Sequence, residues 1–285
     1  MKQIINNNFY INDLKNLKYL LSYTNEQLAD ALKVSRMTLD RWMKGKNKPS
    51  SRELENIYSF AYRMDIDLNS IKTQLIKEDN ISVLFHGSKS TITTNIDLKH
   101  NTKNNDFGNG FYLGETYEQS ASFISNTSSH LVYVFTFDTK GLKKAEYKVD
   151  QEWMITIAHF RGRLQEYENS TKLKQILVKL KNVDYIVAPI ADNNMYQIIN
   201  KFINSEISDE QCKHALSATN LGMQYILLSD KAIEKLKLVT TLYVCDDEKR
   251  ELIQNKNKEI KTTQHKIQLI NQKYYGKGKL IGKIL

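Results

Sequence analysis

Two short strings that combine glycine with aromatic residues constrain the fold of this chain more than any other feature. The first, at residues 85–88, closes an apolar and β-branched run, which predicts a strand with His86 and Gly87 at its carboxyl end. The second, at residues 107–113, has a glycine on each side of Asn109 and predicts a sharp turn into another strand. The strings therefore predict two strand ends that leave backbone open to a ligand.

The residue types in these strings suit a flat ligand that forms hydrogen bonds. His86 offers a directional hydrogen bond to a ribose hydroxyl, and Gly87 lets the backbone approach a planar carboxamide because it has no Cβ. The ring of Tyr112 suits stacking on a flat heterocycle. Each string alone is also typical of an ordinary strand end or hairpin, so both interpretations stay open on this evidence.

Taken together and in this order, the strings resemble the histidine and tyrosine positions of the ADP-ribosyltransferase superfamily, in its diphtheria-toxin and poly(ADP-ribose)-polymerase branch. Later segments are similar to an uncharacterised bacterial family usually placed in that superfamily, at residues 118–123, 152–161, 185–192 and 223–232. The resemblance covers residues 81–240 and implies a split β-sandwich that uses NAD as its co-substrate. The cofactor contacts that it implies are His86, Gly87, Ser88, Gly110, Phe111 and Tyr112.

One position departs from the active transferases. They carry a glutamate at the start of a late strand, where it binds the ribose 2′-hydroxyl and stabilises an oxocarbenium-like transition state; this chain has Gln224 there. An amide can hold the hydroxyl but supplies no negative charge, which costs on the order of 3 kcal/mol, or about a hundredfold in rate. The resemblance thus implies that Gln224, Tyr112 and His86 form the catalytic set, and that this set lacks the negative charge of the glutamate.

Three interpretations of Gln224 stay open: a slower or differently assisted transferase, an NAD-binding sensor without turnover, and a misaligned register. The uncharacterised family also tends to carry glutamine here, so the residue does not indicate decay. Glu152 and Asp192 are the carboxylates to test as replacements for the glutamate, although a solvated or helix-capping role is the more common one for either residue.

A separate helical module precedes these strings. Residues 24–32 have helical spacing of small and apolar side chains, with Thr24 as N-cap and Gln27 placed for a capping box. Ser35 caps a second helix that ends at Gly45, and a basic loop leads into a further helix at residues 51–64. The pattern predicts two helices joined by a short turn, with Leu39 and either Trp42 or Met43 facing inward.

This module strongly resembles the phage-repressor (Cro/C1-like) helix-turn-helix class over residues 13–75, in which the second helix enters the major groove of DNA. The resemblance implies that DNA is a partner through residues 24–48, and a homodimer is left open. A module used only for dimerisation or protein docking is the alternative. The implied base or phosphate contacts are Arg36, Met37, Thr38 and Arg41, with Lys44, Lys46 and Lys48 on the DNA backbone.

The chain has 285 residues, enough for two domains, and its expected strands and helices intersperse without regular βαβ alternation. We therefore predict an α+β fold: an all-α helix-turn-helix bundle at residues 10–77, a transferase-like split β-sandwich with helices at 81–245, and a basic tail at 246–285. The tail predicts a loosely amphipathic helix followed by a flexible basic run at residues 274–279. Such a tail could contact nucleic acid or an acidic partner. A solvated helix with a frayed end is the alternative.

Composition sets further bounds. The net charge of +9 falls mainly on the helical module and the tail, and no run of about 18 apolar residues predicts a membrane span. The first residues have no apolar core typical of a secretory signal, and two distant cysteines, Cys212 and Cys245, fit a reducing cytoplasm. No zinc-like spacing links the six histidines, among them His100, so no metal is predicted.

The sequence thus predicts a cytoplasmic NAD-dependent ADP-ribosyltransferase-like protein joined to a DNA-binding module, with a toxin or defence effector as one role. The alternative is a transcription regulator that senses NAD or a related nucleotide without consuming it. The ADP-ribose acceptor is open among protein, DNA, RNA and water.

Overall fold

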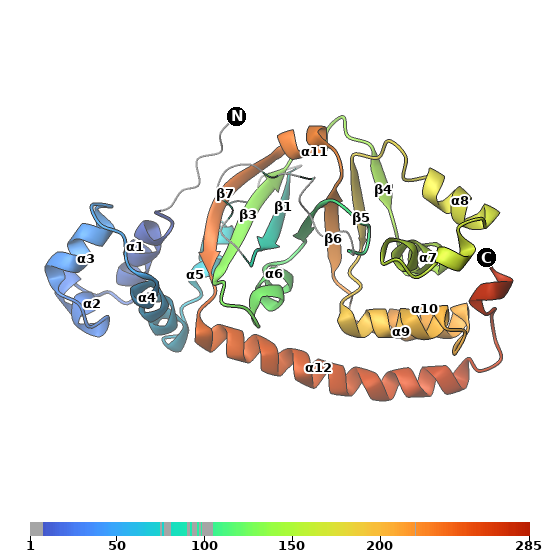
Figure 1. Ribbon diagram of the computed structural model, residues 1–285. Coiled ribbons are helices and arrows are strands. Elements are labelled where there is room, and N and C mark those ends of the chain that lie inside the picture. The colour runs from blue at the N-terminus through green and yellow to red at the C-terminus, as the bar shows by residue number, and fades with distance from the viewer. Residues whose placement is uncertain are drawn as a thin grey trace. The chain divides into compact units, whose positions relative to one another are not determined.

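The computed structural model describes residues 8–74, 76, 81–89, 92, 96, 98, 105–219 and 221–285 (Figure 1). Predictions that fall on His100, on the first seven residues and on the boundary at residue 77 lie outside this description. The chain divides into two compact units. The first unit comprises Met1–Asn95, Tyr117–Phe137 and Lys237–Gln254, and the second unit comprises Ile96–Thr116, Asp138–Leu236 and Asn255–Leu285.

The first unit begins with helices whose ends follow the predicted caps. Thr24 and Gln27 form the expected capping box, and Ser35 accepts a hydrogen bond from the backbone of Thr38. Leu39 and Trp42 are buried, which confirms the predicted inward face. These helices are α1 (Tyr10–Leu20), α2 (Asn25–Ala31), α3 (Arg36–Met43), α4 (Ser51–Arg63) and α5 (Leu68–Gln74).

Three strands of the first unit follow the order β1 (Ser82–Gly87), β3 (Leu131–Phe137) and β7 (Leu236–Tyr243). β1 and β3 are antiparallel. β1 ends with His86 and Gly87, which confirms the predicted strand with these two residues at its carboxyl end. A Cβ on Gly87 would lie 2.3 Å from the backbone oxygen of Ser120 in α6 (Tyr117–Ile124), so this close approach requires glycine.

The strands of the second unit follow the order β4 (Lys144–Glu146), β5 (Tyr185–Pro189), β6 (Met223–Leu227) and β2 (Phe111–Gly114). β4 is parallel to β5, and the other two pairs are antiparallel. The helices of this unit pack around a core that includes the fully buried Trp153, Phe202 and Ile226. They are α7 (Gln151–Phe160), η2 (Gln165–Tyr167), α8 (Thr171–Val178), α9 (Asn193–Ile203), α10 (Asp209–Ser217) and α11 (Asp230–Glu234).

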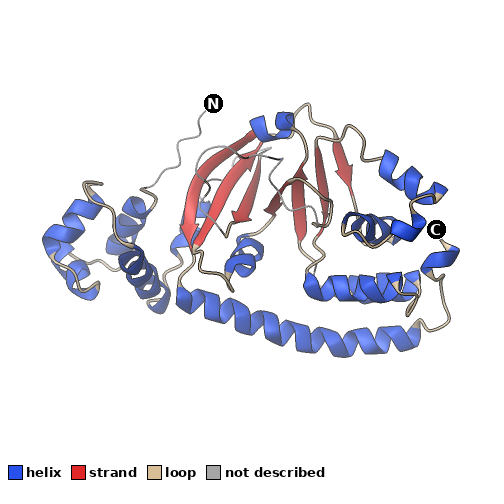
Figure 2. Cartoon of the chain, viewed as in Figure 1, coloured by secondary structure: helices blue, strands red, loops and turns tan. Residues whose placement is uncertain are grey.

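Interspersed helices and strands (Figure 2) confirm the predicted α+β class. The predicted tail helix is α12 (Asp246–Lys273). The segment after it does not extend as a flexible run, because Ile281 in η3 (Ile281–Lys283) is fully buried and the Tyr274 ring stacks on His214 with centroids 3.9 Å apart. Within the described residues, no helix combines the length and the apolar character that a membrane span requires.

Candidate functional sites

The turn that leads into β2 is built by two glycines that no other residue can replace without movement. Gly108 has a φ of +72°, and a Cβ on it would lie 2.9 Å from the Phe160 ring. A Cβ on Gly110 would lie 2.5 Å from Cγ2 of Ile226 on the neighbouring strand. Close packing against these side chains therefore fixes where β2 begins, and with it the position of Tyr112.

Tyr112 is half-buried, and two hydrogen bonds of its hydroxyl hold the ring in place. The hydroxyl donates to the backbone oxygen of Gly108 at 2.8 Å and accepts from the backbone N–H of Phe107 at 3.1 Å. Burial raises the pKa of this phenol above its ordinary value, so the group stays neutral at physiological pH. The structure thus gives Tyr112 a fixed orientation set by the glycine turn.

Gln224 lies on the same face of the second-unit strands as Tyr112. It pairs with Gly114 across β2 and β6, where Tyr112 pairs with Ile226, and alternate residues of a strand share a face. Gln224 is buried, and its Nε2 donates to Oδ2 of Asp106 at 3.0 Å and to the backbone oxygen of Pro189 at 3.2 Å. Both amide hydrogens are therefore used within the protein, and a ligand would meet only the acceptor oxygen.

Asp106 is the centre of this network. It is 5% exposed and accepts hydrogen bonds from Nε of Arg161 at 3.0 Å and from the backbone N–H of Ala191 at 3.1 Å, besides the one from Gln224. Arg161 in turn donates to the Ala191 oxygen at 2.8 Å, and its guanidinium lies 4.0 Å from the centre of the Tyr196 ring. The carboxylate is thus paired and saturated, as a buried charge requires.

Sequence reasoning missed Asp106 and noted Arg161 only as the end of a helix with a family resemblance. The partners of Asp106 lie 55, 85 and 118 residues away along the chain. No local periodicity or spacing connects residues so far apart, so only the folded chain identifies the network.

The two carboxylates considered as replacements for a glutamate have structural roles. Asp192 caps α9 by accepting from the backbone N–H groups of Asn194 and Met195, each at 3.0 Å. Glu152 pairs with Lys179 at 2.5 Å, and that lysine is largely exposed. The capping and solvated alternatives therefore describe these two side chains.

The remaining predicted NAD contacts fall in the first unit. His86 is half-buried on β1 and pairs with Tyr133 of β3, Gly87 is buried beside α6, and Ser88 follows directly after the strand. The structure places Gly110, Phe111, Tyr112 and Gln224 together on β2, on the turn before it and on β6. The predicted contacts are thus divided between the two units.

The residues predicted to contact DNA lie around α3. Arg36, Met37 and Arg41 are exposed, with Met37 at 61%, and 3.6 residues per turn places Met37 and Arg41 on the side opposite Leu39. Thr38 is half-buried, with its hydroxyl 2.8 Å from that of Ser35. The further cations of this surface are exposed: Lys44, Lys46 and Lys48.

One group of residues in the first unit has ligand atoms close enough for a metal ion. Ligand atoms of Glu55, His130 and Asp246 lie within 4.8 Å of one another. Nδ1 of His130 is 2.9 Å from the Val244 oxygen, and its Nε2 is 3.9 Å from Asp246. A histidine so oriented can also serve an ordinary ion pair, and the sequence separation of the three residues gave no metal-binding motif.

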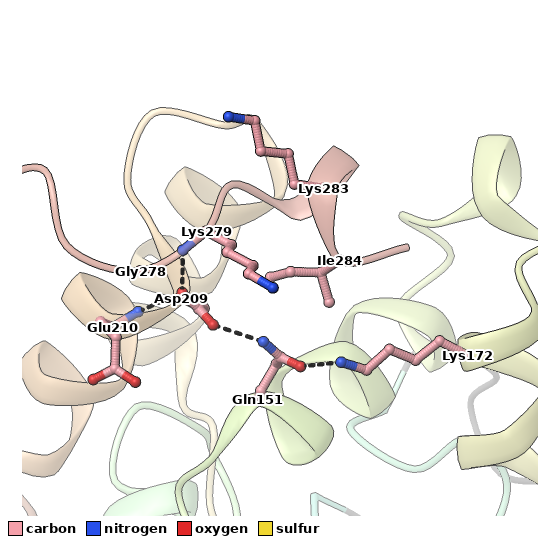
Figure 3. Close-up of a pocket in the computed structure, with 8 residues that line it drawn as sticks. All are labelled: Gln151, Lys172, Asp209, Glu210, Gly278, Lys279, Lys283 and Ile284. Atoms are coloured by element: carbon pink, nitrogen blue, oxygen red, sulfur yellow. Dashed lines mark hydrogen bonds between the residues drawn. The ribbon is translucent and has the colours of Figure 1, made fainter.

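A second-unit pocket of about 340 Å³ lies where the end of the chain meets α10 (Figure 3). Asp209 accepts from the backbone N–H of Lys279 at 2.7 Å and from Gln151 at 2.6 Å, and Gln151 accepts from Lys172. Gly278 has a φ of +82°, and a Cβ on it would lie 2.4 Å from Asp209. Asp209 thus binds the backbone of the C-terminal segment here and is itself held by Gln151, so we interpret the pocket as the docking place of that segment.

Comparisons with known proteins yield one match. No curated protein and no solved structure matches the chain. A family model described as Protein of unknown function (DUF3990) matches residues 82–238, which is more than half of the 285 residues. The match begins at β1 and includes the glycine turn, Asp106, Arg161 and Gln224, whereas the helices from α1 to α5 precede it. The chain therefore belongs, through residues 82–238, to the DUF3990 family of unknown function.

Proposed function

We propose that this protein binds DNA through α3 and that its DUF3990 domain is an NAD-dependent ADP-ribosyltransferase-like domain. The observation that carries the second part is the fixed ring of Tyr112 beside Gln224 on one face of β2 and β6. A rigid aromatic ring after a glycine turn suits stacking on nicotinamide, and Gly110 and Phe111 offer backbone beside it. The resemblance adds His86, Gly87 and Ser88 as contacts.

In the transferase reaction, the bond between C1′ of the ribose and the nicotinamide nitrogen breaks, and nicotinamide leaves with the electron pair. An acceptor nucleophile then forms a bond to C1′ and loses its proton to solvent. The Gln224 amide is fixed by Asp106, so its oxygen is the atom that can accept from the ribose 2′-hydroxyl. The buried carboxylate nearest to that amide is neutralised by Arg161, so it gives the developing cation little support. We therefore expect a transferase with a low turnover rate.

A second candidate is a regulator that binds NAD or a related nucleotide without turnover. It is favoured by the same amide, because Gln224 is held by two acceptors and carries no charge. In this function, α3 positions the protein on DNA, and nucleotide binding changes the fraction of DNA sites that the protein occupies. A toxin or defence effector is a third role that fits the transferase. Measuring cell growth after induction of the gene separates this role from that of a sensor.

The deciding experiment incubates the purified full-length protein with labelled NAD, with and without cell lysate. The variants are His86→Ala, Tyr112→Ala and Tyr112→Phe, with Tyr275→Ala as control because Tyr275 is 84% exposed. Released nicotinamide or labelled macromolecule that is lost in His86→Ala and Tyr112→Ala supports the transferase, and Tyr112→Phe tests the ring apart from its hydroxyl.

Saturable NAD binding without turnover supports the sensor instead. Absence of binding contradicts both functions. A Gln224→Glu variant sharpens a positive result, since an ionised carboxylate at this position should raise NAD hydrolysis if the ribose lies against it. Asp106 and the Pro189 oxygen disfavour the ionised form, so hydrolysis is measured at several pH values.

A further inference from the structure

The positive charge of the chain is concentrated in its last residues, which none of the proposed functions uses. Residues 255–285 contain eight lysines and a single acidic side chain, Glu259, so they carry a net charge of +7 out of +9 for the whole chain. This segment comprises the second part of α12, η3 and the residues between and after them, and it lies within the second unit. A charge placed so unevenly indicates a partner of opposite charge.

One side of this part of α12 is fixed against the second unit. Ile267 and Ile270 pack against the second-unit core, and Nε2 of Gln211 in α10 donates to the backbone oxygen of Asn271 at 2.9 Å. Figure 1 shows this part of the helix running beside α10. These contacts fix which side of the helix faces the core and which faces outward.

The outward side of the helix carries lysines. At 3.6 residues per turn, Lys258 and Lys261 lie on the side opposite the packed positions 267 and 270, and both are exposed. Lys266 and Lys273 lie at one flank of this side and are exposed as well. From Lys258 to Lys273, a rise of 1.5 Å per residue gives a row about 22 Å long. An extended row of this length suits an extended polyanion.

Most of these lysines have no acidic partner. Within the residues that the structure describes, Lys256 pairs with Asp192 at 3.4 Å, and none of the other seven lysines of the segment forms an ion pair. The start of α12 differs, because Arg250 pairs there with Asp247. Ammonium groups without a carboxylate beside them repel one another, and a polyanion that binds them gains from the release of its counterions.

Two lysines at the end of the helix are held beside an aromatic ring. Nζ of Lys273 lies 5.6 Å from the centre of the Tyr274 ring, and Nζ of Lys277 lies 5.2 Å from it. The Tyr274 ring stacks in turn on His214 of α10, with centroids 3.9 Å apart. These contacts limit where both ammonium groups lie, so less side-chain entropy is lost when they bind a phosphate.

We propose that a basic face, made of Lys258, Lys261, Lys266, Lys273 and Lys277, binds the phosphate backbone of duplex DNA without reading its sequence. Duplex DNA carries one negative charge per about 1.7 Å, so a row about 22 Å long meets about 13 phosphates. Lysine suits this contact as a point charge. Arginine, whose planar fork suits base edges, does not occur in residues 255–285.

Other polyanions suit this face less well. A helix that lies on an anionic membrane inserts its apolar side, whereas here Ile267 and Ile270 are taken up by the core. Leu269 is the one large apolar side chain that the described α12 exposes. The major groove of B-DNA admits an α-helix, whereas that of A-form RNA is too deep and narrow for side chains to enter.

The test is fluorescence anisotropy of the full-length, nucleic-acid-free protein with two labelled DNA duplexes of unrelated sequence, at several salt concentrations. The triple variant Lys258→Gln, Lys261→Gln and Lys266→Gln should weaken binding to both duplexes equally, by at least about tenfold at low salt. The slope of log affinity against log salt should fall by about one for each lost phosphate contact. Glutamine has nearly the helix propensity of lysine, so α12 should stay formed.

A matched triple variant makes the same charge change elsewhere on the second unit. Lys140, Lys174 and Lys181 are exposed and lie outside α12. Lys140→Gln, Lys174→Gln and Lys181→Gln together should weaken binding by less than about twofold, because salt screens charges that do not touch the DNA. A double variant, Lys273→Gln with Lys277→Gln, tests the end of the row and should lower the slope by about two.

Three results would overturn the proposal. They are equal losses of affinity in the two triple variants, an unchanged salt slope, and binding of single-stranded RNA or of anionic lipid vesicles that is as tight as that of duplex DNA. The comparison is repeated in protein that carries Arg36→Ala and Arg41→Ala. The loss should persist there, because the basic face does not depend on α3, and a loss that disappears would contradict an independent DNA surface.

Discussion

Asp106 in the second unit is a buried carboxyl group, Glu248 in the first is half-buried, and their surroundings differ. Asp106 receives hydrogen bonds from Arg161, Ala191 and Gln224, and a full positive charge balances it. Glu248 receives one from Tyr117, itself bonded by Asn69, whose oxygen has no donor. The comparison teaches that a carboxylate with a full set of donors serves the scaffold, whereas one with a single donor and no cation beside it has a raised pKa.

The largest expected effect is at the saturated cluster. Asp106→Ala leaves the partly buried Arg161 charge without its partner, which should lower the free energy of unfolding by about 3 to 5 kcal/mol. Urea unfolding followed by circular dichroism measures it. Asp138→Ala removes a carboxylate from an exposed ion pair with Lys235 and should cost less than about 1 kcal/mol. Equal losses in both variants would contradict the scaffold role of Asp106.

The second effect is a pH dependence from the unsaturated cluster. The pKa of Glu248 rises from 4.5 to about 7 in the folded chain, so the native state binds more protons than the unfolded state between these values. Stability should therefore fall as pH rises from about 5 to about 7, by at most about 3 kcal/mol. Subtracting the curve of Glu248→Gln from that of the unmodified protein isolates this contribution, and parallel curves would refute it.

Much of the local structure follows from short-range chemistry. Thr24 with Gln27 and Ser35 were predicted as helix caps, and each accepts the expected backbone hydrogen bond. Such caps are visible in sequence because both partners lie within one turn. The hydrogen bond from Asn69 to the Tyr243 oxygen was not visible in the sequence, because the two residues lie 174 positions apart.

Two strands were also missed, for different reasons. β4 has only three residues, too few for an alternating pattern to show. β7 alternates over only part of its length, because its last residues are buried in succession. The site residues on β2 were found from glycine and tyrosine, whereas Asp106, which holds Gln224, required long-range contacts.

A smaller effect tests whether the glycine turn fixes β2. Gly110→Ala brings a Cβ against Ile226 and should lower the free energy of unfolding by about 1 to 3 kcal/mol. Gly282→Ala is the control, since its nearest atom would be the Tyr167 hydroxyl at 3.6 Å. If Gly110→Ala unfolds at the same urea concentration as Gly282→Ala, the close approach is not what positions the strand.

The smallest effect concerns the exposed cations of α3. Arg36→Ala and Arg41→Ala should each weaken DNA binding by about 1 kcal/mol and lower the slope of log affinity against log salt by about one for each lost phosphate contact. Lys15→Ala on α1 is the control, exposed and outside the predicted surface. Fluorescence anisotropy at several salt concentrations measures both quantities, and an effect of Lys15→Ala equal to theirs would argue against a DNA surface on α3.

The core around α1 to α5 also includes Tyr243 and Cys245, and this has a consequence for how the chain acquires its structure. Lys72 donates to the Thr241 oxygen across 169 residues, and the backbone of Asp246 donates to Glu55 across 191. Closing loops of this length costs entropy before the contacts repay it, and folding slows as the mean sequence separation of contacts rises. A five-helix module of local contacts folds in microseconds to milliseconds, whereas this one reaches its final packing only after the region near residue 243 has been synthesised and has returned to it.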